Sequence, residues 1–415
     1  MHVALLSPAW PVDNSSNGIV TYVHHLRLAL VARGHRVSIV TQALMTGHRE
    51  PGVYLVRPHL LDRWPLRRKR RMLRREISWG ERVAAAFEAL HRIDPIDVIE
   101  MEESFGWCAA VGERVPVPLV VKLHGPAFLS LVEEEVKAES GLQKIADEGA
   151  ALARMMYITS PSTDTLQQTL TRYRLDPSLA RCVPNLIGND VAFTPWRVER
   201  ARAETLLFVG RFDQRKGGDT VVRAFAKLSD ENPELQLVFV GPDRGVPAAE
   251  AASMLGFEAF CTRVLTPLQR QRVHYKGQLP RSAVFALREQ AALTLVASRW
   301  ENQPNTALEA MMQGCPVVSA DAGGMRELIE HGITGTLFRA GDVDDLCAGV
   351  RAVLASPQRA ATMAMLGQQR VTERHGVDRC VEQTLEVYRG AIDANKPAGM
   401  RRTAVTAQMP CGVSR

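Results

Sequence analysis

The chain has 415 residues, of which 46% are hydrophobic, and its 51 Lys and Arg exceed its 45 Asp and Glu by a formal net charge of +6. This length predicts two or three domains with enough apolar residues for buried cores, and so mild a charge excess neither indicates nor excludes a nucleic-acid partner. The seven scattered cysteines lack a Cys-x-x-Cys pair, no apolar run reaches the ~18 residues of a membrane span, and the N-terminus lacks signal-peptide features, so we expect a cytoplasmic protein with reduced thiols.

Short apolar runs alternate with helical stretches along the chain. Val-, Leu- and Ile-rich runs with little polar alternation predict strands that are buried on both faces, at 3–7, 37–41, 97–101, 118–123, 205–210, 235–241, 293–298 and 316–320. Helical periodicity predicts helices between and after them, including 18–33, 217–231, 280–290, 342–355 and 377–393. Such alternation predicts parallel sheets built from right-handed βαβ units.

The series of strands and helices restarts after a polar, proline-containing linker at 184–204. We therefore predict an α/β fold of two doubly wound, Rossmann-like domains that face a cleft. The expected first domain is 1–190 and the second is 201–376, followed by a last helix at 377–394. The segment 395–415 is rich in Arg, Thr and Ala without periodicity, and we expect it to be disordered.

Two cations flank the start of the second series, in LLFVGRFDQRKGGDT. Arg211 follows a predicted strand, and Lys216 precedes Gly217 and Gly218 at a helix start. A helix N-terminus is positive through its dipole and its free N–H groups, and the glycines let a bulky anion approach the backbone. Arg forks onto phosphate oxygens and Lys adds a point charge, so the pattern suits a diphosphate. Two solvated surface cations are the alternative interpretation.

Two carboxylates stand eight positions apart in SRWENQPNTALEAMMQGCPVV. Pro304 suits the first turn of a helix, so Glu301 lies on the loop before the helix and Glu309 about a turn and a half into it. The loop follows a predicted parallel strand, at the edge where open α/β sheets bind ligands. One acid can reach a sugar ring and the other a ribose diol, while free N–H groups between them can receive phosphate. For either Glu alone, a charge favoured by the helix dipole is the alternative.

Three further features are expected at the cleft. Gly18 starts a helix after the first strand, His124 directly follows an apolar strand, and the turn DAGGMREL carries Gly323, Gly324 and Glu327. A single His at a strand end is more often structural than catalytic, and glycine pairs are usually turns.

Together, these motifs resemble the retaining glycosyltransferases of the GT-B fold, specifically the nucleotide-sugar-dependent family 4. The spacing of Glu301 and Glu309 matches the family's E-x7-E motif, and ALEAMMQGCPVVSADAGGMRELIEHGITGTLF resembles its continuation. FVGRFDQRKGG matches the VGR…KG element, and NGIVTYVHHLRLALVARGHRVSIVT resembles the N-terminal strand–loop–helix segment. With HG at 124–125 and VPN at 183–185, the resemblance covers about residues 1–393. The combination in this order is specific.

The resemblance implies a role for each motif. Glu301 and His124 form the expected catalytic pair, contacting the donor sugar from the two sides of the cleft. Glu309 would hold the ribose, and backbone atoms near Leu279 in the loop GQLP would hold the base edge. The remaining expected donor-binding residues are Gly18, Arg211, Lys216, Asn305 and Thr306.

The implied reaction is retaining, metal-independent transfer from a UDP- or GDP-linked sugar to a hydroxyl acceptor, in cell-surface polysaccharide or glycolipid synthesis, with no cofactor. A dehydrogenase would need G-x-G-x-x-G and a P-loop enzyme G-x-x-x-x-G-K-[ST]; both are absent from the sequence. Asp342 and Asp344 match the Asp-x-Asp string of metal-dependent transferases, but they open a predicted helix and suit capping better. A catalytically inactive sugar-nucleotide-binding module is the alternative.

The sequence departs from the family pattern at two loops. Many members carry a glycine-rich segment after the first Glu, whereas this chain has Asn302, Gln303, Pro304 and Asn305. The N-terminal loop often has two glycines, but here Asn17 precedes a single Gly18. Donor recognition is expected to differ in detail at both loops.

A basic stretch, RWPLRRKRRMLRR at 63–75, holds eight cations in thirteen residues with Trp, Leu and Met interleaved. A solvated loop or helix face is one interpretation. The sharper one is an anionic membrane surface, because each nearby cation adds ~1 kcal/mol and the apolar residues can dip in. A lipid-linked or other saccharide acceptor at the inner face of the cell membrane would fit this interpretation. Nucleic acid is disfavoured, because aromatic residues for stacking are few.

Overall fold

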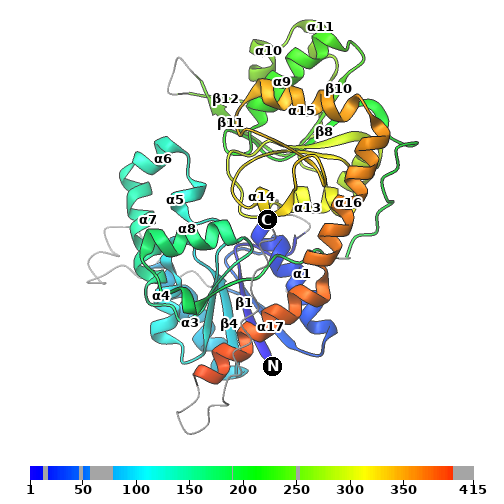
Figure 1. Ribbon diagram of the computed structural model, residues 1–415. Coiled ribbons are helices and arrows are strands. Elements are labelled where there is room, and N and C mark those ends of the chain that lie inside the picture. Colours follow the sequence, from blue (N-terminus) through cyan, green and yellow to red (C-terminus); the bar gives the residue numbers. More distant parts are fainter. Residues whose placement is uncertain (13–16, 46–49, 57–77, 189, 249–252, 396–415) are drawn as a thin grey trace.

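The computed structural model describes residues 1–12, 17–45, 50–56, 78–188, 190–248 and 253–395. It contains two parallel sheets, each within its own α/β domain, which lie one above the other in Figure 1. The predicted fold class is therefore confirmed. The basic stretch at 63–75 and all but the first residue of the predicted tail lie outside the described residues. None of the helices in the described ranges is both long enough and apolar enough to cross a membrane.

The first domain holds a seven-stranded sheet in the order β3-β2-β1-β4-β5-β6-β7. Its strands are β1 His2–Ser7, β2 Arg36–Thr41, β3 Val53–Leu55, β4 Val98–Glu102, β5 Leu119–Lys122, β6 Ile158–Ser160 and β7 Ala180–Cys182. Its helices are α1 Gly18–Ala32, α3 Trp79–Ile93, α4 Cys108–Arg114, α5 Ala127–Ser130, α6 Glu133–Lys137, α7 Glu139–Leu152 and α8 Thr163–Tyr173, with short 3-10 turns at Ser104–Gly106 and Pro177–Leu179.

The second domain holds a six-stranded sheet in the order β13-β10-β8-β14-β15-β16. Its strands are β8 Arg202–Val209, β10 Gln236–Val240, β13 Val273–Tyr275, β14 Ala291–Val296, β15 Val317–Ala320 and β16 Thr336–Phe338. A small sheet adds β9 Phe212–Asp213, β11 Asp243–Pro247 and β12 Met254–Leu255. The helices are α9 Gly218–Glu231, α10 Phe257–Val264, α11 Pro267–Arg270, α12 Arg281–Gln290, α13 Asn305–Met312, α14 Met325–Leu328, α15 Val343–Leu354 and α16 Pro357–His375.

Each large sheet reverses its strand order beside its first strand. In the first sheet β1 lies between β2 and β4, with Leu5 opposite both Ile39 and Glu100, and in the second β8 lies between β10 and β14. The loops after β1, β4, β8 and β14 leave the carboxyl edges at these reversals. Ligands of doubly wound sheets bind at such edges.

The sequence located the long strands to within one to three residues, because each is an apolar run buried on both faces. The pattern β1 HVALLS, for example, is buried at all six positions. Most strands missed by sequence are short: β3, β6, β7, β13 and β16 have three residues each, and β9 and β12 have two. Three residues are too few for any periodicity to appear. The exception is β11, whose five residues DRGVP contain no apolar run.

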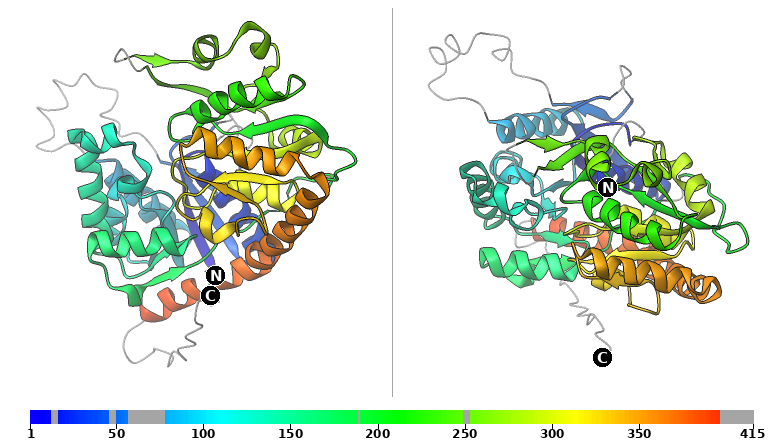
Figure 2. Two further views of the ribbon diagram at one scale, coloured as in Figure 1. Left: turned by 45° about the horizontal axis from the view of Figure 1, so that its top comes forward. Right: turned by 90° about the horizontal axis from the view of Figure 1, so that it is seen from above.

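The last helix, α17 Val377–Ala394, follows α16 and packs against the first domain (Figures 1 and 2). Its buried face joins the apolar cluster beneath β1 and α1, through Cys380, Val381, Leu385, Tyr388 and Ala391. The Tyr388 hydroxyl also donates to Glu100 Oε2 at 2.9 Å in the core of the first domain. The helix that ends the described chain thus closes one face of the first sheet.

Candidate active site

The loop after β14 carries Glu301, whose side chain is 9% exposed. Its Oε1 accepts a hydrogen bond from Ser298 Oγ at 2.7 Å and pairs with the Lys216 ammonium. Burial opposes ionisation, but the charges of Lys216 and Arg215 outweigh it and hold the pKa of the Glu301 carboxyl below its usual value. The carboxylate is therefore charged and fixed in direction. Sequence reasoning predicted Glu301 and Lys216 separately but not that they pair.

The turn before α9 brings Lys216 to this acid. Gly217 adopts φ 71° as the N-cap of α9, and a Cβ there would lie 2.0 Å from the Ala297 carbonyl oxygen. Only glycine allows that approach of the turn to the end of β14. Asp213, which sequence reasoning missed, organises both predicted cations: it accepts from Arg211 Nε at 2.7 Å and from the Lys216 backbone N–H at 2.6 Å.

Helix α13 begins directly behind Glu301. Pro304, expected within the first turn, is the N-cap, so the helix itself begins at Asn305. The Pro304 carbonyl accepts a hydrogen bond from Ala307 N at 3.1 Å. Asn305 and Thr306 are the first two helical residues, whose N–H groups have no acceptor within the helix. A Cβ built on Gly18, the first residue of α1, would lie 3.6 Å from Asn305 Nδ2. The starts of α1 and α13 thus lie close together across the domain boundary.

Glu309 lies one turn further along α13, with its side chain 13% exposed. Its Oε1 accepts from Arg281 Nε at 3.0 Å, and its Oε2 lies 3.7 Å from Arg288 Nη2, which is fully buried. Leu279 lies two residues before Arg281, partly buried against the small apolar cluster that includes Leu207 and Val240. Glu309, predicted to hold the ribose, and Leu279, predicted to meet the base edge, therefore both lie near the start of α12.

Arg281 extends this group across the domain boundary. Its Nη1 donates to Asp190 Oδ2 at 2.7 Å, and Asp190 Oδ1 lies 3.0 Å from His25 Nε2 of α1. Burial opposes ionisation of Asp190, but hydrogen bonds from His24, His25 and Arg281 hold its pKa well below the usual range. Sequence reasoning missed all of these partners. A cavity of about 10 Å³, room for about one water molecule, lies beside Arg281, Asn305 and Glu309.

His124 follows β5 in the first domain. Its backbone N–H donates to Glu103 Oε2 at 2.9 Å, and the N–H of Gly125 donates to Glu103 Oε1 at 2.7 Å. The imidazole meets the Tyr22 ring edge-on, with centroids 5.1 Å apart. Burial, helped by the nearby Lys122 charge, lowers the pKa of His124 to about 3. His124 is therefore a neutral imidazole at physiological pH, able to hydrogen-bond a sugar hydroxyl without adding charge.

The turn after β15 supports the Glu301 loop and reaches the first domain. Gly324 N donates to the Glu301 carbonyl at 3.0 Å, and a Cβ on Gly323 would lie 2.1 Å from the same oxygen. The Glu327 carboxylate accepts from Thr163 N at 2.9 Å and from Asp164 N at 2.7 Å, at the start of α8. Glu327 is thus an interdomain contact and not a group open to a ligand.

Asp342, the first residue of the Asp-x-Asp string, accepts from the backbone N–H groups of Asp344 and Asp345 at 3.0 Å each. It is the N-cap of α15, as the helix-capping interpretation predicted.

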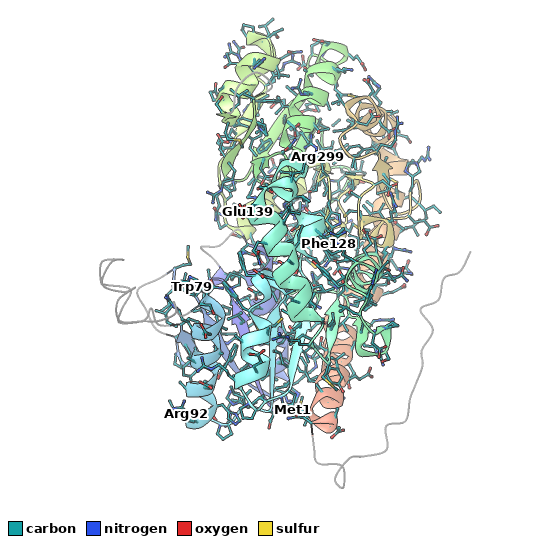
Figure 3. The ribbon with its side chains drawn as sticks, turned by 90° about the vertical axis from the view of Figure 1, so that its left-hand side faces the viewer. Met1, Trp79, Arg92, Phe128, Glu139 and Arg299 are labelled. Atoms are coloured by element: carbon teal, nitrogen blue, oxygen red, sulfur yellow. The ribbon has the colours of Figure 1, made fainter. Side chains whose placement is uncertain are left out.

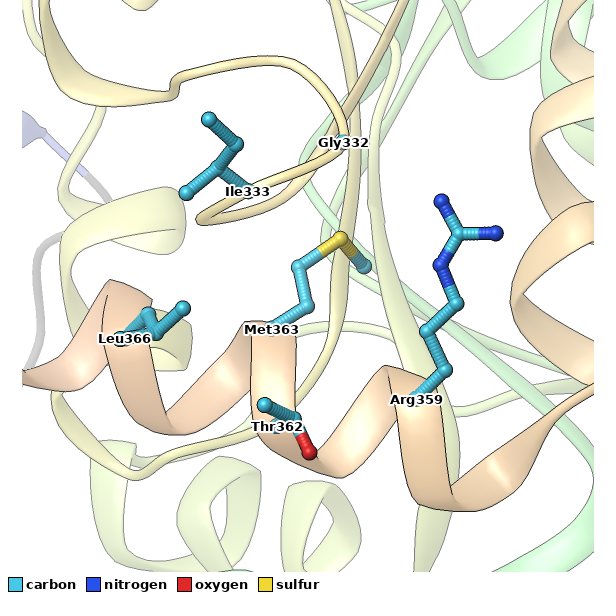
Figure 4. A pocket seen from close by; sticks show the side chains of 6 residues that line it. All are labelled: Gly332, Ile333, Arg359, Thr362, Met363 and Leu366. Carbon is cyan, nitrogen blue, oxygen red and sulfur yellow. The ribbon is translucent and has the colours of Figure 1, made fainter.

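The domains are seen from the side in Figure 3, where Arg299 of the second domain lies above Phe128 and Glu139 of the first. Arg299 forms a bidentate pair with Asp219, at 2.9 and 2.8 Å, which fixes the loop two residues before Glu301. A larger cavity of about 460 Å³ lies elsewhere, beside α16, lined by Ile333, Arg359, Met363 and their neighbours (Figure 4). It contains none of the predicted site residues.

Each of the two domains is similar to a family of glycosyltransferases. Residues 196–370 match the family described as glycosyl transferases group 1, and residues 16–190 match glycosyltransferase family 4. The D-inositol 3-phosphate glycosyltransferase 1 of Catenulispora acidiphila is 27% identical over 94% of this chain and 95% of its own. The glycogen synthase of Mycobacterium tuberculosis is 24% identical over 95% of this chain and 96% of its own.

Solved structures share the fold. The sucrose-phosphate synthase of Thermosynechococcus elongatus has a TM-score of 0.71 at 23% identity, covering 95% of this chain and 99% of that one. The Anabaena protein HepE, solved with UDP-glucose, has a TM-score of 0.68 at 18% identity, covering 94% of this chain and 100% of that one. The chain therefore has the two-domain GT-B fold of these structures, and it is similar to the group 1 glycosyltransferases in its second domain and to glycosyltransferase family 4 in its first.

Proposed function

We propose that this protein is a retaining glycosyltransferase that moves a sugar from a UDP- or GDP-linked donor to an acceptor hydroxyl, without a divalent metal ion. The acceptor is proposed to be a saccharide or glycolipid of the cell surface. The observation that carries the proposal is the Lys216–Glu301 pair, set between the starts of α9 and α13 with Glu309 a turn further along.

The reaction breaks the bond between the anomeric carbon and the diphosphate oxygen and forms a bond to the acceptor oxygen, whose proton passes to the departing diphosphate or to water. Negative charge builds on the departing diphosphate. Arg211, whose side chain is 38% exposed, and Lys216, which pairs with Glu301 on the loop before α13, are the cations proposed to meet this charge. Preorganised charges of this kind stabilise a developing anion without reorganisation, so they can do the work that a metal ion does in other transferases.

The two acids have separable roles in this proposal. Glu301 would accept hydrogen bonds from donor-sugar hydroxyls. Its pairing with Lys216 would link the sugar to the cation that faces the diphosphate. Glu309 would accept hydrogen bonds from the ribose diol. Arg281 and Arg288 hold the Glu309 carboxylate in place. The neutral His124 would contact the sugar from the first domain, and Leu279 would meet the base edge.

The first experiment screens a panel of UDP- and GDP-linked sugars for donor hydrolysis and for thermal stabilisation. UDP-glucose is the first choice, because HepE was solved with it. Glu301→Ala is expected to lower turnover by roughly 10²–10³, typical of losing one preorganised transition-state contact. Glu309→Ala is expected mainly to raise the donor KM. If both variants turn over like the parent, the proposed site is wrong.

Three further measurements test the finer statements. Activity that a chelator abolishes and magnesium or manganese restores would contradict metal independence. The anomeric configuration of the product, read by NMR, tests retention. A protein that binds a sugar nucleotide but neither hydrolyses nor transfers it would be the inactive binding module instead.

A further inference from the structure

The loop that carries Glu301 contacts the segment that carries His124 at two places. The residue after Glu301 makes one contact, and the residue before it makes the other. Asn302, 3% exposed, donates from Nδ2 to the Leu123 carbonyl at 3.0 Å. Its Oδ1 accepts from Ser162 Oγ at 2.6 Å. Leu123 directly precedes His124, so one side chain joins the residue after Glu301 to the residue before His124.

Trp300 makes the matching contact on the other side. A Cβ built on Gly125 would lie 3.6 Å from Trp300 Cζ3 and 3.9 Å from Cη2, so the indole rests against Gly125. Gly125 directly follows His124. The two residues that flank Glu301 therefore contact the two residues that flank His124, although some 175 positions separate the segments.

Each segment is fixed within its own domain. Glu103 holds the N–H groups of His124 and Gly125, and Leu123 N donates to the Thr159 carbonyl at 2.7 Å. On the other side, Ser298 and Lys216 hold the Glu301 carboxylate. Because both ends are rigid, the contacts between them set the separation of the two side chains.

We propose that Asn302 is a positioning residue that holds Glu301 and His124 at a fixed separation between the two domains. The proposal rests on the proposed function, in which both side chains contact the donor sugar. It also explains the departure from the family's glycine-rich segment, because a glycine at 302 could bond neither Leu123 nor Ser162. Most of the proposed donor contacts lie in the second domain, so losing Asn302 should change turnover and leave donor binding intact.

The test compares Asn302→Ala with Glu327→Ala, which also removes two hydrogen bonds between the domains, to Thr163 N and Asp164 N, but none of the contacts between the residues flanking Glu301 and those flanking His124. For hydrolysis of the sugar nucleotide found in the donor screen, Asn302→Ala is expected to lower kcat about 10- to 100-fold, since misplacement by about 1 Å can cost that much. Its donor KM should stay within about threefold, and Glu327→Ala should keep kcat within about threefold. Asn302→Asp, which keeps the size but turns a carboxylate oxygen toward the Leu123 carbonyl, should behave like Asn302→Ala.

Hydrogen exchange gives a readout that needs no activity. Exchange in segments 118–126 and 299–304 should rise together in Asn302→Ala and stay at the parent level in Glu327→Ala. Unchanged exchange in those segments, an unchanged kcat, or an equal loss of kcat in Glu327→Ala would overturn the positioning role. A parent that hydrolyses no sugar nucleotide would instead refute the proposed function, and exchange would still decide whether Asn302 joins the two segments.

Discussion

Burial tunes several acids at the carboxyl edge of the first sheet. Glu102, at the end of β4, is 3% exposed, and its Oε2 has no hydrogen-bond partner among the described residues. Burial raises the pKa of Glu102 from 4.5 to about 8, and raises the pKa of Glu148 to about 7. Glu102 is therefore held protonated at neutral pH.

This residue predicts a pH dependence of stability. A carboxyl with a raised folded pKa binds its proton more tightly when folded, so the free energy of unfolding falls as the pH rises from 4.5 to about 8. Glu102→Gln mimics the protonated acid. It should flatten this slope, by at most about 1.4 kcal/mol per pH unit, and be more stable than the parent at pH 8. Denaturant unfolding between pH 5 and 8 measures it, with exposed Glu234→Gln as the control. If the free energy of unfolding depended on pH equally in Glu102→Gln and the parent, the raised pKa of Glu102 would be contradicted.

Gly217 predicts a second residue-scale effect. Gly217→Ala would combine a left-handed backbone with a Cβ 2.0 Å from the Ala297 oxygen, whereas Gly34→Ala, at φ 77°, meets nothing within 4 Å. Gly34→Ala should therefore cost only the conformational strain of about 1–2 kcal/mol. Gly217→Ala should cost more and lower donor turnover, because Lys216 moves with the turn. Equal unfolding free energies for the two variants would show that the close approach does not matter.

At the scale of elements, α17 is the clearest case of a segment whose place depends on distant partners. Its apolar stripe is visible in the sequence, but the surface it covers belongs to β1, β4 and α1, some 280–380 residues earlier. Leu385 is 2% exposed in that contact. The helix therefore contributes to the stability of the first domain.

Leu385→Ala should lower the free energy of unfolding by about 2–5 kcal/mol, the usual result of emptying a buried leucine site. Exposed Glu386→Ala on the same helix should change it by less than about 0.5 kcal/mol. Chemical denaturation of both variants decides the matter. A loss of under 1 kcal/mol for Leu385→Ala would mean that α17 is loosely packed on this domain.

For the whole molecule, the expected donor contacts belong to both domains: Gly18 and His124 to the first, and Arg211, Lys216 and Glu309 to the second. The nucleotide should therefore stabilise both. At 100 times its Kd, the nucleoside diphosphate of the active donor should raise the free energy of unfolding by about 2.7 kcal/mol. Hydrogen exchange should slow at the edges of both sheets, and Glu309→Ala should reduce the effect at the same nucleotide concentration. Protection confined to the second domain would argue against a site shared across the cleft.

Sequence patterns predicted the features that depend on residues close together in the chain. The long strands are apolar runs, the E-x7-E spacing sets Glu301 and Glu309 a short distance apart on one loop and helix, and the glycines beside Lys216 make a tight helix start. These depend on periodicity, turn chemistry and helix geometry, which act over a few residues. The two-domain α/β fold followed from the order of such elements.

Contacts between groups far apart in the chain became visible in the folded structure alone. Nothing local indicates that Asn302 would bond Leu123, that Asp190 would join Arg281 to His25, or that Glu103 would hold the backbone of His124. Each of these contacts is between buried polar groups far apart in the chain, or between domains. Such groups must find partners when water is removed, and which partner each one meets depends on how the two sheets and their loops pack together.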